Sequence, residues 1–124
     1  PGDHGTTFGG GPLVTSVARY VVERISQPEF LADVQETGAY LKDRLQEINS
    51  PLIADVRGRG LMIGLELTVD VAPAIQAGYE HGLLMVNAGP RVIRFVPPLV
   101  AQKADVDNLV NKLTAILAEM GAAQ

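Results

Sequence analysis

The chain has 124 residues, of which 47% are hydrophobic and 19% are charged, and its net charge is −4 at pH 7. This composition is typical of one globular domain with a modest core, and the mixed charges form no basic stripe that would favour nucleic acid as a partner. The absence of cysteine excludes disulfides and thiolate metal sites, and no apolar run approaches the roughly 18 residues that suggest a membrane span.

A glycine-rich segment, PGDHGTTFGGGP, opens the chain at residues 1–12. Glycine permits positive φ and the close approach of another group, and the hydroxyls of Thr6 and Thr7 stand beside free N–H groups near a helix start. Such a segment can cradle an oxyanion or a phosphate group. A flexible connection into the helix is the alternative, and the residues alone leave both open. His4 is a candidate base, although a lone histidine in a glycine loop more often bonds to the backbone.

Two helices are expected after this segment. Pro12 suits the first position of a helix, and apolar residues at helical spacing continue to Ile25. A Ser-Gln-Pro break at 26–28 ends this helix and begins a second one, which is expected to reach about residue 49. Gly38 falls on the apolar stripe of the second helix and indicates close contact with a neighbouring element.

Beyond residue 51 the hydrophobic period changes to two, which predicts strands at 52–56 and 61–67. The second of these is nearly all apolar, as expected for a strand covered on both faces. Between them, Arg-Gly-Arg-Gly at 57–60 is expected to form a tight turn with surface arginines, and an anion nest is the alternative.

The remaining elements complete a mixed fold. A short helix at 72–81 is expected to turn Ile75 and Tyr79 inward. Two strands at 83–86 and 91–96 follow, and a final helix begins near residue 105. Helices on one side of a small, mostly antiparallel sheet are the economical arrangement of these elements, so the predicted class is α+β. The order of the strands does not follow from the pattern.

Arg94 is the sharpest candidate outside the glycine-rich segment. It stands in Val-Ile-Arg-Phe-Val at 92–96, a strand otherwise without polar groups. A buried guanidinium needs an anionic partner, because an unpaired buried charge is very costly. Arg94 is therefore a candidate clamp for a substrate carboxylate, with an internal ion pair or a solvent-facing strand end as alternatives. The two histidines, His4 and His81, have no ligand spacing, so no metal site is expected.

Three motifs in this order carry a family resemblance: GDHGTTFGG at 2–10, VRGRGLMIGLEL at 56–67 and IRFVPPL at 93–99. Together they resemble the C-terminal portion of a class III aminotransferase, a family that depends on pyridoxal 5'-phosphate. The sequence of the first motif is most similar to that of the acetylornithine aminotransferases. The resemblance implies a glycine-rich cofactor-phosphate loop at 1–12. It also implies, at 13–124, the small C-terminal domain of fold type I transferases with its leading helix.

The resemblance also implies a role for each candidate residue. Thr7 would bind the cofactor phosphate in the active site of the partner subunit of a homodimer, and Thr6 would contribute through its backbone or hydroxyl. Arg94 would hold the α-carboxylate of the substrate. In this family the lysine that forms the Schiff base precedes the loop, and the lysines of this chain, at 42, 103 and 112, match no such position. The chain therefore has no expected catalytic residue of its own and is not expected to catalyse transamination alone. Gly11 is a further departure, because the family usually has asparagine there.

The parent enzyme implied by this resemblance would transfer the amino group of N-acetylornithine to 2-oxoglutarate in arginine biosynthesis. Ornithine, succinylornithine and 4-aminobutyrate aminotransferases are the alternatives within the family. A non-catalytic assembly module is the alternative of a different class. Since no signal peptide opens the chain, the cytoplasm is the expected location, without a membrane partner.

Overall fold

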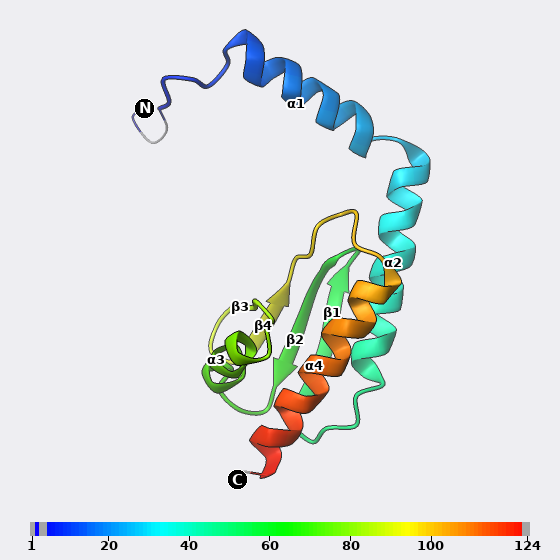
Figure 1. Cartoon of the computed structure of the whole chain (residues 1–124), viewed down its shortest axis with the longest axis vertical. Coiled ribbons are helices and arrows are strands. Elements are labelled where there is room, and N and C mark those ends of the chain that lie inside the picture. Colours follow the sequence, from blue (N-terminus) through cyan, green and yellow to red (C-terminus); the bar gives the residue numbers. More distant parts are fainter. Residues whose placement is uncertain (1, 3–4, 123–124) are drawn as a thin grey trace. The chain divides into compact units, whose positions relative to one another are not determined.

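The structure of the chain is a computed structural model, which describes residue 2 and residues 5–122. His4 and its predicted role lie outside the described residues. The elements in chain order are labelled in Figure 1: α1 (Pro12–Ile25), α2 (Pro28–Gln46), β1 (Ile53–Arg59), β2 (Met62–Leu67), α3 (Ala72–Glu80), β3 (Val86–Asn87), β4 (Val92–Phe95) and α4 (Lys103–Ala122). None of the helices in the described ranges is long and apolar enough to cross a membrane.

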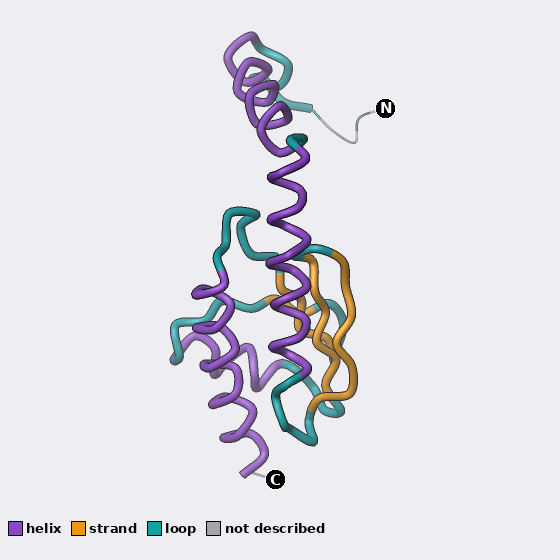
Figure 2. Tube along the Cα trace, turned by 90° about the vertical axis from the view of Figure 1, so that its right-hand side faces the viewer, coloured by secondary structure: helices purple, strands orange, loops and turns teal. Residues whose placement is uncertain are grey.

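The strands form one antiparallel sheet in the order β1-β2-β4-β3. Figure 2 shows the strands, in orange, as one layer with helices, in purple, on one side of it. The predicted α+β class is confirmed. The strand order, which the sequence did not predict, brings β2 and β4 side by side although α3 and β3 lie between them in the chain.

The core lies between one face of this sheet and the helices. Along β2, Ile63, Leu65 and Leu67 are buried, while Met62 on the other face is exposed. The expectation that this strand is covered on both faces is therefore wrong, because the outward positions of β2 hold Met62, Gly64 and Glu66. The opposing surface comes mainly from α4, whose buried side chains are Val106, Val110, Leu113, Ile116 and Leu117.

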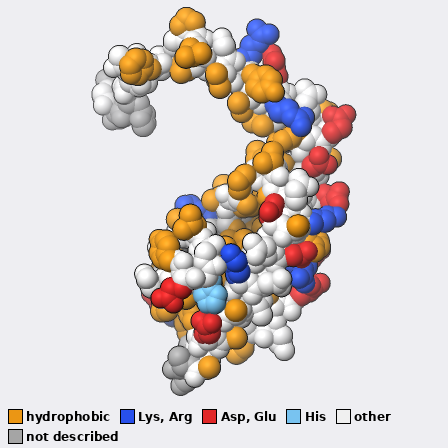
Figure 3. Space-filling model, viewed as in Figure 1, with side chains coloured by type: hydrophobic (Ala, Val, Ile, Leu, Met, Phe, Trp, Pro, Cys, Tyr) orange, Lys and Arg blue, Asp and Glu red, His pale blue; other side chains and the backbone are white. Residues whose placement is uncertain are grey.

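Contacts divide the chain into two units, Pro1–Asp33 and Val34–Gln124. The second unit contains the sheet and its core. In the first, α1 has the predicted bounds, but none of its residues is buried. Its exposed apolar side chains are drawn in orange in Figure 3, where they follow the helix: Leu13, Val14, Val17, Tyr20, Val21 and Val22. The predicted domain division after residue 12 stays a prediction.

The hairpin of β1 and β2 differs from the predicted one in length. Arg57, Gly58 and Arg59 do not form a turn but pair with Gly64, Ile63 and Met62 in the ladder. The reversal falls at Gly60, whose φ of +53° is a left-handed conformation that favours glycine. Glycine is also required at Gly58, since a Cβ there would overlap the carbonyl oxygen of Met62. Gly58 therefore allows the two strands to pair closely, and Gly60 allows the chain to reverse directly after β1.

Gly38 makes the close contact that its position on the apolar stripe predicted. A Cβ at this position would overlap the carbonyl group of Gly60, so α2 approaches the β1–β2 turn backbone to backbone.

The short helix α3 turns only one of the two predicted residues inward, because Ile75 is partly buried against the core and Tyr79 is not. Ala74 and Gly78 are buried, whereas 59% of Tyr79 is exposed. Gly78 lies against the carbonyl of Leu83 and the methyl group of Met85, and a side chain there would overlap both. The small residues therefore set the packing of α3 together with Ile75, and the inward position predicted for Tyr79 is wrong.

Candidate functional site

The loop that carries Thr6 and Thr7 is exposed and leads directly into α1. Neither hydroxyl has a hydrogen-bond partner among the described residues. Gly9 gives room to Thr6, because a Cβ on Gly9 would overlap the threonine methyl group. Gly10 has a φ of +78°, a conformation that a side chain would strain.

The start of α1 adds further donors to this loop. Gly11 is the N-cap residue and supplies no side-chain cap, and the first N–H with a helical acceptor is that of Thr15, which donates to Gly11 O at 3.1 Å. The N–H groups of the first turn are therefore free to meet an acceptor from outside. Two free hydroxyls and free N–H groups at a helix N-terminus match the needs of a phosphate group.

Arg94 lies in β4, directly opposite Gly64 of β2 and Val86 of β3. Its side chain is exposed, while its neighbours Ile93 and Phe95 point into the core. Of the alternatives that the sequence left open, the solvent-facing position therefore holds, because strand alternation places Arg94 on the face without helices. Within the described residues Arg94 makes no ion pair. An exposed guanidinium without an internal carboxylate is available to an external anion.

A second arginine on the same face is already paired with carboxylates. Nη1 of Arg57 donates to Oδ2 of Asp55 at 2.9 Å and to Oε2 of Glu66. These two hydrogen bonds raise the pKa of Arg57 above its usual value, and the bond to Asp55 contributes the larger part. The sequence interpretation missed this cluster because it placed Arg57 in a turn. The signal that could have found it is the two-residue spacing of Asp55 and Arg57, which continues the strand period.

The predicted residues fall in two parts of the chain. Thr6 and Thr7 belong to the unit at 1–33 and Arg94 to the unit at 34–124, and each is described within its own unit.

The three lysines occupy helices, as expected. Lys103 donates to Oε1 of Glu36 at 2.6 Å and lies 5.5 Å from the ring centre of Tyr40. The hydrogen bond to Glu36 raises the pKa of Lys103. Lys112 donates to the carbonyl oxygen of Gly82 at 3.2 Å, and Lys42 is half-buried in α2. These contacts join elements of the fold, and none of them presents an amine in a site with Arg94.

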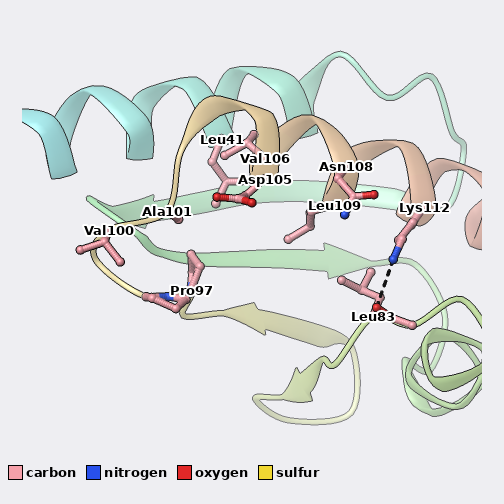
Figure 4. A pocket seen from close by; sticks show the side chains of 12 residues that line it. Leu41, Leu83, Pro97, Val100, Ala101, Asp105, Val106, Asn108, Leu109 and Lys112 are labelled. Atoms are coloured by element: carbon pink, nitrogen blue, oxygen red, sulfur yellow. Dashed lines mark hydrogen bonds between the residues drawn. The ribbon is translucent and has the colours of Figure 1, made fainter.

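A pocket of about 380 Å³ lies between α4, the segment that follows β4, and Leu83 (Figure 4). Its floor includes the core residues Leu41 and Val106, so it opens on the helical side of the sheet. Its charged groups already have main-chain partners: Oδ2 of Asp105 accepts from Gln102 N, and Lys112 donates to Gly82 O. This pocket contains none of the predicted site residues.

Comparisons with known proteins agree on one family. The family model described as "Aminotransferase class-III" matches residues 1–117. A protein named "Probable acetylornithine aminotransferase, mitochondrial", from Dictyostelium discoideum, is 47% identical over 114 residues, which cover 89% of this chain and 25% of that protein. The ornithine aminotransferase of Bacillus subtilis (strain 168) is 45% identical over 118 residues, or 94% of this chain and 29% of that protein.

A solved structure gives the same answer. The crystal structure of N-acetylornithine aminotransferase from Stenotrophomonas maltophilia K279a matches with a TM-score of 0.82 at 36% identity, covering 94% of this chain and 34% of that one. The chain thus spans about a third or less of the length of these relatives. The family model covers nearly the whole sequence, and it includes the loop, the β1–β2 hairpin and the strand of Arg94. The chain therefore belongs to the class III aminotransferase family.

Proposed function

We propose that these residues form the C-terminal portion of an acetylornithine aminotransferase, which moves the amino group of N-acetylornithine to 2-oxoglutarate. The observation that carries the proposal is the state of Arg94: a guanidinium without an ion pair in the described part of the chain, on a face whose carboxylates are already held by Arg57. The names of the Dictyostelium and Stenotrophomonas relatives support N-acetylornithine as the amino donor.

The cofactor fits the loop at the level of its chemistry. Class III aminotransferases use pyridoxal 5'-phosphate, and the free hydroxyls of Thr6 and Thr7 with the free N–H groups of α1 suit its phosphate. When bound, this cofactor supplies an electron sink and carries the amino group between the two substrates. We place Thr7, assisted by Thr6, on the phosphate of the cofactor in the partner subunit of a homodimer. The cytoplasm stays the predicted location, although the name of the Dictyostelium relative describes that protein as mitochondrial.

Arg94 orients the substrate in this proposal. Its planar guanidinium can donate two parallel hydrogen bonds to one carboxylate, which fixes direction as well as position. A fixed α-carboxylate in turn fixes the reacting carbon and limits the geometries that the substrate can sample.

A crossed pair of substitutions in the complete enzyme that contains this sequence tests the two roles. Arg94→Ala should raise KM for 2-oxoglutarate by about ten- to hundredfold, because hydrogen bonds between charged groups stabilise by about 1.5–3 kcal/mol, while the bound cofactor remains. Thr7→Ala should do the reverse and weaken cofactor retention by about 1–3 kcal/mol. KM is measured by steady-state kinetics and cofactor retention by absorbance after dialysis.

Each variant has a matched control. Arg91→Ala removes another exposed arginine just before β4 and should leave KM near the wild-type value. Thr7→Ser keeps the hydroxyl and should keep the cofactor. A loss of cofactor in Arg94→Ala with unchanged KM would show that the carboxylate role is wrong.

Ornithine is the second candidate donor, because the Bacillus subtilis ornithine aminotransferase is nearly as similar as the Dictyostelium protein, at 45% against 47% identity. Ranking kcat/KM for N-acetylornithine, ornithine, succinylornithine and 4-aminobutyrate decides among the donors. Preference for unacetylated ornithine would replace the proposed donor and leave the role of Arg94 intact. An enzyme without activity on any of the four would favour the non-catalytic assembly module.

A further inference from the structure

Glu66 stands between two arginines on the exposed face of the sheet. In the register of β2, Gly64 lies opposite Arg57 on one side and opposite Arg94 on the other. Glu66 follows Gly64 by two residues on the same face, so it is diagonal to both arginines. Diagonal neighbours on antiparallel strands are about 7–8 Å apart, which long side chains can span. Either arginine is thus within reach of Glu66.

Within the described residues, Glu66 pairs with Arg57 and leaves Arg94 open. The same nitrogen of Arg57, Nη1, also holds Oδ2 of Asp55. One guanidinium therefore binds two carboxylates. Gly64 places no side chain between Arg57 and Arg94, and the side-chain atoms nearest to its missing Cβ are Cγ1 of Val92 at 3.3 Å and Cγ of Arg57 at 4.0 Å.

Asp55 is the weaker competitor for Arg94. Asp55 lies on β1, directly across the ladder from Glu66 and one strand farther from β4. Glu66 is on β2, which is adjacent to β4. If Arg57 were absent, Glu66 would therefore be the carboxylate that turns to Arg94.

We propose that Arg57 is a positioning residue for substrate binding, which keeps Arg94 open to a substrate carboxylate by holding Glu66. The inference rests on the proposed role of Arg94 and extends it. When Arg57 is lost, Glu66 competes with the substrate carboxylate for one guanidinium and also repels it, since both are negative.

The test is Arg57→Met in the complete enzyme. KM for 2-oxoglutarate should rise about two- to fivefold, the range that an exposed ion pair produces, while kcat and cofactor content stay at wild-type values. Arg57→Met combined with Glu66→Gln should restore KM, because the competing charge is gone. Arg57→Lys keeps a cation beside Glu66 and should restore KM in part. Arg59→Met, which removes the other exposed arginine of β1, is the matched control.

The outcomes separate this inference from the proposed function. If Arg94→Ala raises KM but Arg57→Met does not, the inference is wrong and the role of Arg94 stands. If Arg57→Met raises KM and Glu66→Gln fails to restore it, Arg57 acts through structure alone and the inference is again wrong. If Arg94→Ala leaves KM unchanged, the proposed role of Arg94 and the inference about Arg57 are both wrong. A crystal structure of Arg57→Met should show the Glu66 carboxylate hydrogen-bonded to Arg94, and a carboxylate turned to solvent would contradict the inference independently of kinetics.

Discussion

Gly38 fixes the packing of two elements through the side chain that it lacks. Any Cβ at this position of α2 would meet the backbone of Gly60, and Gly60 needs its own glycine because its φ is +53°. The apolar stripe of α2 indicated that Gly38 touches a neighbour. It could not indicate which one, because the partner is 22 residues away in a turn whose position the pattern misjudged.

Gly38→Ala should therefore destabilise the chain although alanine favours helices. The gain in helix propensity is about 1 kcal/mol, whereas overpacking costs about 1–3 kcal/mol, and the high end applies because backbone atoms cannot swing aside. Urea denaturation of the wild type and the variant measures the free energy of unfolding. Gly121→Ala in α4 is the matched control, since no atom lies near its Cβ position, and it should be neutral or stabilising. A Gly38→Ala variant as stable as the wild type would contradict the close contact.

Arg94 shows how far residue patterns lead to the site. The position of this arginine in an apolar strand identified it as a candidate, but Val92 and Val96, on the same face of the strand, made that face look buried. The network around Arg57 was out of reach, because Asp55 and Glu66 meet only through the pairing of β1 with β2.

A polar bridge joins α2 and α4. Tyr40 Oη donates to Oδ1 of Asp107 at 2.7 Å, and Nε of Arg44 donates to the same oxygen at 3.0 Å. Nη1 of Arg44 donates also to Oε2 of Glu47. The hydrogen bond from Tyr40, and then that from Arg44, hold the pKa of Asp107 below its usual value. The ionised carboxylate is therefore the form that stabilises this pair of helices.

The bridge predicts a pH dependence of stability on the acid side. A lowered pKa in the folded state contributes stability that is present above the unfolded pKa of about 4 and is lost as the pH falls through the folded value. Asp107→Asn should be less stable than the wild type at pH 7, and the difference should shrink below about pH 4. Tyr40→Phe removes the larger of the two causes and should weaken the acid dependence as well. Urea midpoints from pH 2 to 7 measure the effect, and parallel curves for all three proteins would contradict it.

The helices were easier to predict than the strands. The bounds of α1 follow from Pro12 and the break at 26–28, which are local signals. The extent of β1 depends instead on its partner, because Arg57–Arg59 become strand only when β2 supplies their hydrogen bonds. Likewise β3 is Val86–Asn87 and shares only Val86 with the predicted strand at 83–86, because Leu83 and Met85 lie against Gly78 of α3.

At the scale of the whole molecule, our proposal gives this chain a part of a site that further residues complete. The chain spans 25–34% of the length of the relatives described above. In our proposal its candidate residues bind phosphate and carboxylate groups, and none of them is a nucleophile. Its apolar helix α1 has no buried residue. Family resemblance, not residue chemistry, supplied the link between the loop and Arg94, because the two lie in separate units.

The 124-residue polypeptide alone is therefore expected to show no transaminase turnover with pyridoxal 5'-phosphate, N-acetylornithine and 2-oxoglutarate. Of its lysines, Lys103 is paired with Glu36 and Lys112 with Gly82, and Lys42 lies in α2. Absorbance at the Schiff-base band and an assay for glutamate formation measure this. Cofactor-dependent turnover by the purified polypeptide would show that the complete reaction needs no residues beyond these 124.

The place of β1 in the sheet has a consequence for self-association. In the described sheet β1 has a neighbour on one side only, and such an edge invites a strand from another molecule. Its ladder is irregular between Ile53 and Asp55, and its charged side chains are Asp55, Arg57 and Arg59. Irregular, charged edges resist strand addition. The charges that keep Arg94 open in our proposal thus also keep this edge from seeding aggregates.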